Sequence, residues 1–181
     1  RGTGTEGEKR AAAYIQEEFK KIGLQPNGDQ GFFTQSFTFK GGIHGTGEDG
    51  LAANIIGYLD NQRESTIILG AHYDHLGNGS QGSSLDANPQ GKIHNGADDN
   101  ASGVAVMSSA LINDSYLLKN NLFVFDGNEE LSYDYPTYWG HGYRVFEKRH
   151  KIILKKAKKI FVVDCVGNGK TNIINDQKII N

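Results

Sequence analysis

The sequence predicts an α/β fold, a three-layer sandwich in which a mixed, mainly parallel sheet carries helices on both faces. From residue 66 onward the chain alternates between strand-like and helix-like segments and ends this series on a strand. Such alternation requires right-handed crossovers, which place helices on the faces of a parallel sheet. Residues 66–71 are β-branched and almost wholly apolar, as expected of a strand covered on both sides. The length of 181 residues fits a single domain.

The first predicted element is a helix that begins after Thr5. Thr5 and Glu8 have the spacing of a capping box, in which the two side chains satisfy free N–H groups of the first turn. Apolar residues then recur at helical spacing until Gly23, which can close the helix. The segments 33–39 and 54–59 have the composition of strands, which could pair with each other.

Further along the chain, composition separates packed elements from one long loop. Residues 77–96 are rich in Gly, Ser, Asn and Gln, which predicts a flexible loop that flanks a site. The other predicted elements, in order, are a helix over residues 101–112, a strand over 122–125, a basic helix over 144–159 and a strand over 160–163. We interpret the basic side chains as a solvated helix face rather than a binding patch.

Charge and composition argue against several classes of partner. The formal net charge of −2 gives no field that would attract nucleic acid or an anionic membrane. The chain has no run of about 18 apolar residues that could span a bilayer. Its one cysteine cannot form an internal disulfide. We therefore expect no nucleic-acid partner and no membrane span.

Histidine and acidic side chains directly follow the predicted strands. In open α/β sheets, ligands bind beyond the carboxyl ends of the strands. The side chains in question are His72, Asp74 and His75 after residues 66–71, Glu129 and Glu130 after 122–125, Asp164 after 160–163, and Asp98 and Asp99 before the helix over 101–112. Imidazole and carboxylate suit zinc, and so many acids in one pocket would raise one another's pKa without a cation. The pattern predicts a metal site.

Each of these pieces alone has an ordinary structural explanation. A His-x-Asp pair can be a surface hydrogen bond, a Glu-Glu pair is usually solvated, and Asp-Asp-Asn before a helix is first of all a cap. Their joint occurrence at strand ends and at a helix start favours the metal site.

Spacing also suggests how the side chains divide the work. Asp74 lies two residues after His72, so in an extended chain it can reach the ring and fix its tautomer. Glu129 and Glu130 are adjacent and must diverge, which fits one metal ligand and one general base without saying which is which. Two adjacent aspartates before the helix diverge in the same way, so that one could bridge two metals and the other cap the helix.

In this order the motifs resemble those of the co-catalytic zinc aminopeptidases, the metallopeptidase family that also contains glutamate carboxypeptidases and glutaminyl cyclases. The resemblance rests on Gly4-Thr-Glu-Gly-Glu8, Asn54-Ile-Ile-Gly57, Gly70-Ala-His-Tyr-Asp-His75, Gly96-Ala-Asp-Asp-Asn-Ala-Ser-Gly103, Glu129-Glu130-Leu131 and Val163-Asp164. It implies four zinc ligands. His72 and Asp164 would bind one zinc ion each, Asp98 would bridge both ions, and Glu130 would be a further ligand. It further implies Glu129 as the catalytic base and a cis peptide bond between Asp98 and Asp99.

The resemblance implies a zinc-dependent exopeptidase, an aminopeptidase that hydrolyses N-terminal peptide bonds through a metal-activated water. Glu129 would take the proton of that water and pass it to the leaving amine. The implied partner is a peptide with a free N-terminus, held by its amine against acidic groups. Secretion, or a periplasmic location, is expected from the family.

Two departures from the family pattern leave alternatives open. The family's last ligand is a histidine downstream of the Asp164 position, and no histidine follows here, so we expect a domain truncated at both ends that binds two zinc ions, one or none. His75, His94 and His141 are other histidines, and their spacing favours none of them. An extra Asn128 and the aromatic passage after it are similar to glutaminyl cyclases. The alternatives are therefore a glutaminyl cyclase and a non-catalytic relative that acts as an interaction module.

Overall fold

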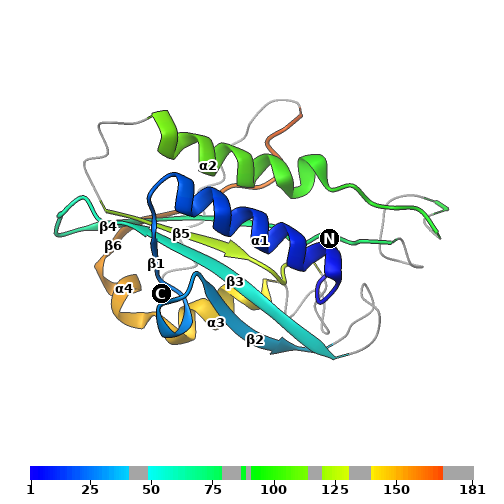
Figure 1. Ribbon diagram of the computed structural model, residues 1–181, viewed down its shortest axis with the longest axis horizontal. Coiled ribbons are helices and arrows are strands. Elements are labelled where there is room, and N and C mark those ends of the chain that lie inside the picture. The colour runs from blue at the N-terminus through cyan, green and yellow to red at the C-terminus, as the bar shows by residue number, and fades with distance from the viewer. Residues whose placement is uncertain (41–48, 79–86, 89–90, 114–119, 131–139, 169–181) are drawn as a thin grey trace.

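The computed structural model describes residues 1–40, 49–78, 87–88, 91–113, 120–130 and 140–168 (Figure 1). The elements in order are α1 (Glu6–Lys21), β1 (Gln25–Pro26), a 3-10 turn (Asp29–Gly31), β2 (Thr34–Phe39), β3 (Gly50–Leu59), β4 (Thr66–His72), a π-helical turn (Ala97–Ser102), α2 (Gly103–Asn113), β5 (Asn120–Asp126), α3 (His141–Arg149), α4 (Lys151–Lys156) and β6 (Ala157–Val162). Much of the predicted loop at 77–96, and the aromatic passage at 131–139, lie outside the described residues.

The six strands of the described chain form one mixed sheet. Its order is β1-β3-β5-β4-β6, and β2 also pairs with β3. Strands β5, β4 and β6 are parallel, while β1, β2 and β5 all run antiparallel to β3. The two early segments that the sequence offers as possible partners, 33–39 and 54–59, belong to β2 and β3, and these strands pair with each other. The parallel half brings the carboxyl ends of three strands to one edge, where the site lies.

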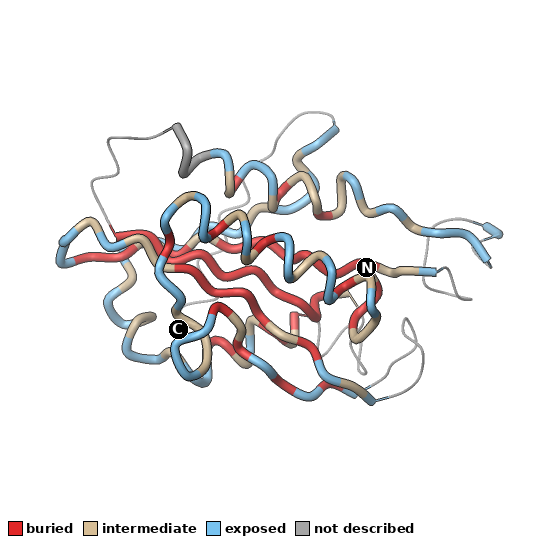
Figure 2. Tube along the Cα trace, viewed as in Figure 1, coloured by how far each residue is buried: buried red, intermediate tan, exposed pale blue. Residues whose placement is uncertain are grey.

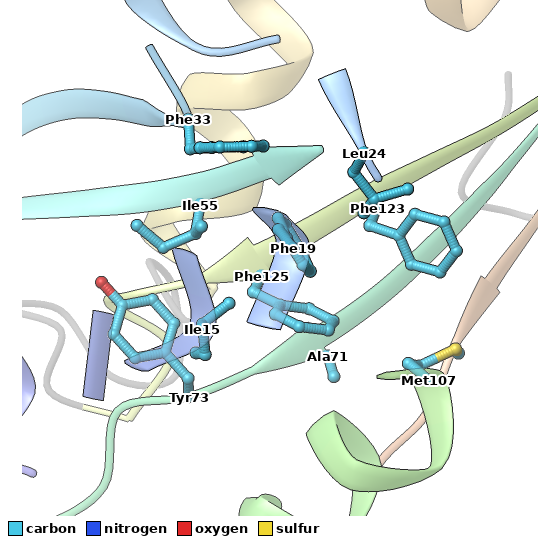
Figure 3. Packing of buried hydrophobic residues seen from close by; sticks show 10 residues of the cluster. All are labelled: Ile15, Phe19, Leu24, Phe33, Ile55, Ala71, Tyr73, Met107, Phe123 and Phe125. Atoms are coloured by element: carbon cyan, nitrogen blue, oxygen red, sulfur yellow. The ribbon is translucent and has the colours of Figure 1, made fainter. Parts of the chain in front are cut away.

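Helices cover both faces of the sheet, as the sequence predicts. Helices α1 and α2 lie on one face and α3 and α4 on the other (Figure 1). Buried positions run along the central strands between these layers (Figure 2). In the core under α1, the ring of Phe19 packs on Phe33, Phe123 and Phe125 at centroid distances of 5.7, 6.2 and 5.3 Å (Figure 3). The predicted α/β sandwich is confirmed.

Helix α1 begins where the capping box predicts. Thr5 Oγ1 accepts a hydrogen bond from the N–H of Glu8 at 3.3 Å. The Glu8 carboxylate does not return to Thr5 but accepts from the N–H of Gly4 and from Tyr73 Oη. Glu8 is therefore a buried link between the N-terminal segment and the end of β4.

The predicted basic helix differs most from the structure. It is two helices, interrupted at His150, and its last predicted residues belong to β6 instead. The His150 ring stacks on Phe146 with centroids 4.7 Å apart, and its Nε2 lies 2.7 Å from Gln35 Nε2. Beyond α4, pairing with β4 overrides the helical spacing of the apolar residues. Lys158 and Lys159 are exposed on β6, which is the last strand on this side of the sheet among the described residues.

Among the helices that the structure describes, none is long and apolar enough to cross a membrane.

Candidate metal centre

The carboxyl ends of β4, β5 and β6 meet at one edge of the sheet, on the side where the chain begins (Figure 1). His72 is the last residue of β4 and lies opposite Asp126, the last residue of β5, in their parallel register. Val163 follows β6 and donates its N–H to Gly70 O at 2.8 Å. The pairing of β6 with β4 thus continues to the residue before Asp164. This register explains why side chains that are distant in sequence gather here.

His72 is the more buried of the two histidines at the centre, and only 3% of its side chain is exposed. Its Nε2 lies 3.0 Å from Asp99 Oδ1 and 3.4 Å from Asp164 Oδ1. Neither ring nitrogen has a hydrogen bond of acceptable geometry to the residues that the structure describes. Ligand atoms of a tetrahedral zinc ion, each about 2.0–2.2 Å from it, lie about 3.3–3.6 Å apart. The spacing around Nε2 is close to that of ligands around a shared cation.

The charge around His72 favours a cation as well. Burial lowers the pKa of His72, but the carboxylates of Asp164, Asp74 and Asp99 raise it by more. The net rise favours the ring in its positively charged form, with a proton on both nitrogens. Histidine binds metals in its neutral form. A metal ion would therefore take the place of that proton between the imidazole and the acids.

The aspartate that joins this group is Asp99, and not Asp98 as the sequence predicts. Asp98 has other partners: its Oδ1 accepts from the N–H of Gly167 at 2.6 Å, and its carbonyl oxygen accepts from Ser102 Oγ at 2.5 Å. Asp99 leaves the helical conformation, with φ −103° and ψ 95°, which turns its side chain toward the strand ends. The cis peptide bond joins Asp99 to Asn100, instead of the expected Asp98–Asp99 bond. The donor aspartate and the cis peptide bond therefore each lie one residue further along the chain than the sequence predicts.

Asp74 supports the centre from below. It is completely buried, and its Oδ1 lies 3.4 Å from His72 Nδ1. Its carboxylate accepts from the backbone N–H groups of Glu129 and Glu130, each at 3.1 Å. A third donor is Thr3 Oγ1, at 3.0 Å. Asp74 thus lies beside the imidazole, and its predicted role in orienting the ring stays a prediction. Its hydrogen bonds fix the turn that carries both glutamates.

Glu129 and Glu130 complete the centre. Burial raises the pKa of Glu129 to about 9, with His72 opposing the rise and Asp74 adding to it. Burial also raises the pKa of Glu130, and His75 opposes that rise through a hydrogen bond. In the metal-free protein, this shift keeps the Glu129 carboxyl protonated at neutral pH, and a cation nearby would lower its pKa so that it could act as a general base. The assignment of Glu129 as the base and Glu130 as a ligand stays a prediction.

Three overlapping groups in the described chain could hold a metal ion. They are His72 with Asp99 and Asp164, His72 with Glu129 and Glu130, and His75 with Asp99 and Glu130, and in each the donor atoms lie within 4.8 Å of one another. His94 and His141 belong to none of these groups. Carboxylates outnumber imidazoles here, and carboxylates this close repel unless a cation lies between them. The donor set therefore fits one or more divalent cations such as zinc.

The N-terminal segment supports the centre in a way that the sequence analysis did not assign. Thr3 donates to Asp74, and Thr3 Oγ1 in turn accepts from Asn128 Nδ2 at 3.3 Å. The Arg1 guanidinium donates through Nη2 to Gly96 O at 2.8 Å. Thr3 lies directly before the Gly4–Glu8 motif, but its contacts with residues about 70 to 125 positions away could not be read from the sequence.

Asp126 is a second support. It is fully buried, and burial raises its pKa to about 7. Its Oδ1 accepts from the N–H of Asn128 at 2.8 Å and its Oδ2 from the N–H of Tyr143 at 3.2 Å. A Cβ on Gly142 would lie only 1.9 Å from Oδ1, so the start of α3 can approach Asp126 only with glycine there. Asp126 thereby ties the glutamate turn to α3.

Solved structures similar to the chain include both peptidases and cyclases. A Zn-dependent exopeptidase from Parabacteroides distasonis has 23% identity and a TM-score of 0.74, and the match covers 93% of this chain and 56% of that one. A glutaminyl cyclase from Tannerella forsythia has 23% identity and a TM-score of 0.73, with 92% and 56% covered. A leucine aminopeptidase precursor from Bacteroides thetaiotaomicron has 18% identity and a TM-score of 0.69, with 92% and 57% covered.

At these identities the likeness establishes the fold alone. The chain spans little more than half the length of each of these structures. No curated protein matches the sequence significantly. The family model of peptidase family M28, however, matches residues 54–177, which is more than half of the chain and includes the described donor residues. The chain belongs to peptidase family M28.

Proposed function

We propose that the chain forms the metal-binding part of a zinc-dependent exopeptidase that releases N-terminal residues from peptides. The observation that carries the proposal is the position of Glu129, a buried carboxylate beside the donor groups around His72, in a chain of family M28. The likeness in fold to a zinc-dependent exopeptidase and to an aminopeptidase precursor supports it.

The zinc would be held by His72, Asp99, Asp164 and Glu130. When bound, it would polarise the scissile carbonyl, lower the pKa of a water molecule and, as a positive charge nearby, lower the pKa of Glu129. Glu129 would accept the proton of the attacking water on a carboxylate oxygen and return it to the leaving amine. Asp74 would keep Glu129 in place through its hydrogen bond to the Glu129 N–H.

The same centre suggests how a substrate would be held. Asp99 and Asp164 are 42% and 44% exposed, so their carboxylates are partly open to solvent at the mouth of the centre. A peptide's free amine is positively charged, and negative carboxylates near the scissile bond would attract it. This charge complementarity supports cleavage at the N-terminus.

A glutaminyl cyclase is the second candidate. The fold is as similar to the Tannerella forsythia cyclase as to the exopeptidase, with TM-scores of 0.73 and 0.74. The extra Asn128 before the glutamate pair, a feature similar to glutaminyl cyclases, also favours the cyclase. Asn128 is part of the folded turn, because its Nδ2 donates a hydrogen bond to Thr3 Oγ1. Cyclisation would remove ammonia from an N-terminal glutamine without breaking a peptide bond.

One assay separates these candidates. The zinc-loaded protein is incubated with aminoacyl-nitroanilides and with a peptide that begins with glutamine. Zinc-dependent release of nitroaniline or of free amino acids supports the exopeptidase, and ammonia release with an intact peptide supports the cyclase. Neither reaction, in a protein that binds zinc, would favour the interaction module. A chelator should abolish the activity and added zinc should restore it.

A further inference from the structure

The small net charge of the chain hides an uneven surface. Residues 144–159 carry eight basic side chains and one acidic side chain, Glu147. Six of the basic residues are exposed lysines, which we call the basic face: Lys148 of α3, Lys151, Lys155 and Lys156 of α4, and Lys158 and Lys159 of β6. We propose that the basic face docks the protein on an anionic lipid bilayer. This inference does not depend on the proposed function.

The charges of the basic face are not neutralised by the fold. None of its six lysines forms an ion pair with a residue that the structure describes. By contrast, Lys20 and Lys21 of α1 each pair with a glutamate of the same helix, at 2.6 and 2.7 Å. Asp60 and Glu64, on the connection that leads into β4 at the same end of the sheet, form no ion pair with the basic face either. The positive charge is therefore free to attract an anionic surface.

The packing of α4 turns its lysines outward. Lys151 and Lys155 are four residues apart, so they lie on the same side of the helix. Ile153 and Leu154 pack on the opposite side, against the core between the sheet and the helices α3 and α4. The lysines thus lie on the outer surface of this helical layer, where α4 leads into β6 (Figures 1 and 2).

Apolar side chains lie exposed among these lysines. Ile152, which follows Lys151 and precedes Lys156 by one helical turn, is 72% exposed. Ile160 is 37% exposed and lies opposite Ile68 in the parallel register of β6 and β4. Because Ile68 packs under α3 and α4, Ile160 faces the same side of the sheet. Basic side chains around exposed apolar ones are typical of surfaces that lie in the interface of an anionic membrane.

A solvated helix face and a nucleic-acid surface are the competing explanations. The sequence alone favours the solvated face, but a face that only meets water does not need exposed isoleucines among its lysines. A nucleic acid would also attract the lysines, and proteins that bind single strands stack bases on aromatic rings. Residues 147–160 contain no Phe, Tyr or Trp. Aliphatic side chains can instead enter the boundary of the lipid chains, which favours the bilayer.

Docking through the basic face would leave the metal centre open. Helix α4 ends where β6 begins, whereas Asp164 follows the other end of β6. A strand rises about 3.3 Å per residue, so the length of β6 separates these two places by about 20 Å. The acidic centre and the basic face therefore lie toward opposite ends of one strand (Figure 1). An anionic bilayer would attract one end and repel the other, which orients the molecule.

The first experiment measures how the protein sediments with vesicles of phosphatidylcholine, with or without phosphatidylglycerol. We expect binding only where phosphatidylglycerol is present, and added salt should weaken it. A lysine near an anionic bilayer adds about fivefold in affinity, so Lys155→Glu combined with Lys156→Glu should lower the affinity by at least about 20-fold. The matched control is Lys20→Glu with Lys21→Glu, the same change of charge on the other face of the sheet, which should leave the affinity nearly unchanged.

The second experiment tests whether an apolar side chain enters the bilayer. Ile152→Ser should lower the affinity for the same vesicles by about tenfold, because the bilayer removes an aliphatic side chain from water. The matched control is Ile93→Ser, because Ile93 is also 72% exposed but lies outside the basic face. Circular dichroism checks that each variant is folded. An unchanged affinity in Ile152→Ser would overturn the choice of a bilayer as the partner.

Other outcomes would overturn the proposal as a whole. These are equal binding to both kinds of vesicle, binding to neither, or an equal loss in the two lysine pairs. Lysine-dependent binding to DNA without binding to vesicles would show a nucleic-acid surface instead. Cleavage of aminoacyl-nitroanilides by the same samples keeps the proposed function separate. Lys155→Glu with Lys156→Glu should not change that rate, and a protein that binds vesicles without cleaving would overturn the exopeptidase alone.

Discussion

The metal centre has two halves that the fold holds in different ways. The floor, made of His72, Asp74 and Glu129, is buried and lies at the ends of β4 and β5. The rim, made of Asp99 and Asp164, is more than two-fifths exposed and lies on irregular chain. In the floor, hydrogen bonds fix Asp74 and the backbone of Glu129, whereas the rim carboxylates converge on one imidazole nitrogen. The floor is thus preorganised by folding, and the rim depends more on the cation that it would bind.

The largest expected effect separates chemistry from binding within the floor. In Glu129→Gln the amide cannot accept a proton, so kcat should fall by about 10²–10⁴-fold. Zinc content should not change. The free energy of unfolding of the metal-free protein at neutral pH should not fall, because glutamine removes the cost of protonating a buried carboxyl whose pKa is raised to about 9. Steady-state kinetics and elemental analysis test this. A kcat within tenfold of the unaltered protein would exclude Glu129 as the base.

The next effect tests whether the floor is part of the folded framework. Asp74→Ala leaves Thr3 Oγ1 and the N–H groups of Glu129 and Glu130 without their acceptor. We expect a loss of about 3–5 kcal/mol in the free energy of unfolding of the metal-free protein, since buried unsatisfied donors cost about 1–3 kcal/mol each. Urea unfolding gives the value. A loss below about 1 kcal/mol would mean that the floor is no better fixed than the rim.

The rim should respond in the opposite way. Asp164→Asn removes one charged ligand from a side chain that is 44% exposed. We expect zinc affinity to fall by at least about 10–100-fold, while the metal-free protein loses no more than about 1 kcal/mol of stability. Zinc titration and urea unfolding of the same sample give both values. A stability loss equal to that of Asp74→Ala would remove the distinction between the halves.

The sequence placed the strand-end residues better than it placed Asp99, and the reason is geometric. Strand ends in a parallel sheet meet at one edge, so His72, the glutamate pair and Asp164 could be placed from the apolar runs that precede them. The position of Asp99 depends instead on the exact path of a distorted turn. Both Asp98 and Asp99 stand before α2, and only the non-helical φ and ψ of Asp99 decide which side chain faces the centre.

The same reason explains what else the sequence missed. The pairing of β6 with β4 starts at Ala157, within what reads as a helix, because hydrogen bonds to a distant strand do not appear in local periodicity. Similarly, His75 meets Glu130 and Asp99 only after folding. By contrast, the fold class and the helix start with Thr5 as its N-cap depend on local patterns, and both could be predicted.

The smallest expected effect is a change in the pH dependence of stability, and it involves Glu8, which contacts Tyr73 next to the floor residues His72 and Asp74. Its carboxylate is buried and accepts from Tyr73 Oη, and burial raises its pKa from 4.5 to about 8. Between these values the folded protein holds a proton that the unfolded chain releases, so the stability of the metal-free protein should fall as the pH rises through this window. Glu129 and Asp126, with pKa values raised to about 9 and about 7, act in the same direction.

Glu8→Gln should flatten this dependence without abolishing it. The amide cannot ionise, so the drop in unfolding free energy between pH 5 and 8 should shrink by about 1–3 kcal/mol. Urea unfolding at several pH values, with chelator present, measures the slope. The matched control is Glu6→Gln, in the same first turn of α1 but exposed, which should leave the slope unchanged. An equal slope in Glu8→Gln and in the unaltered chain would show that ionisation of Glu8 does not contribute to the pH dependence of the unfolding free energy.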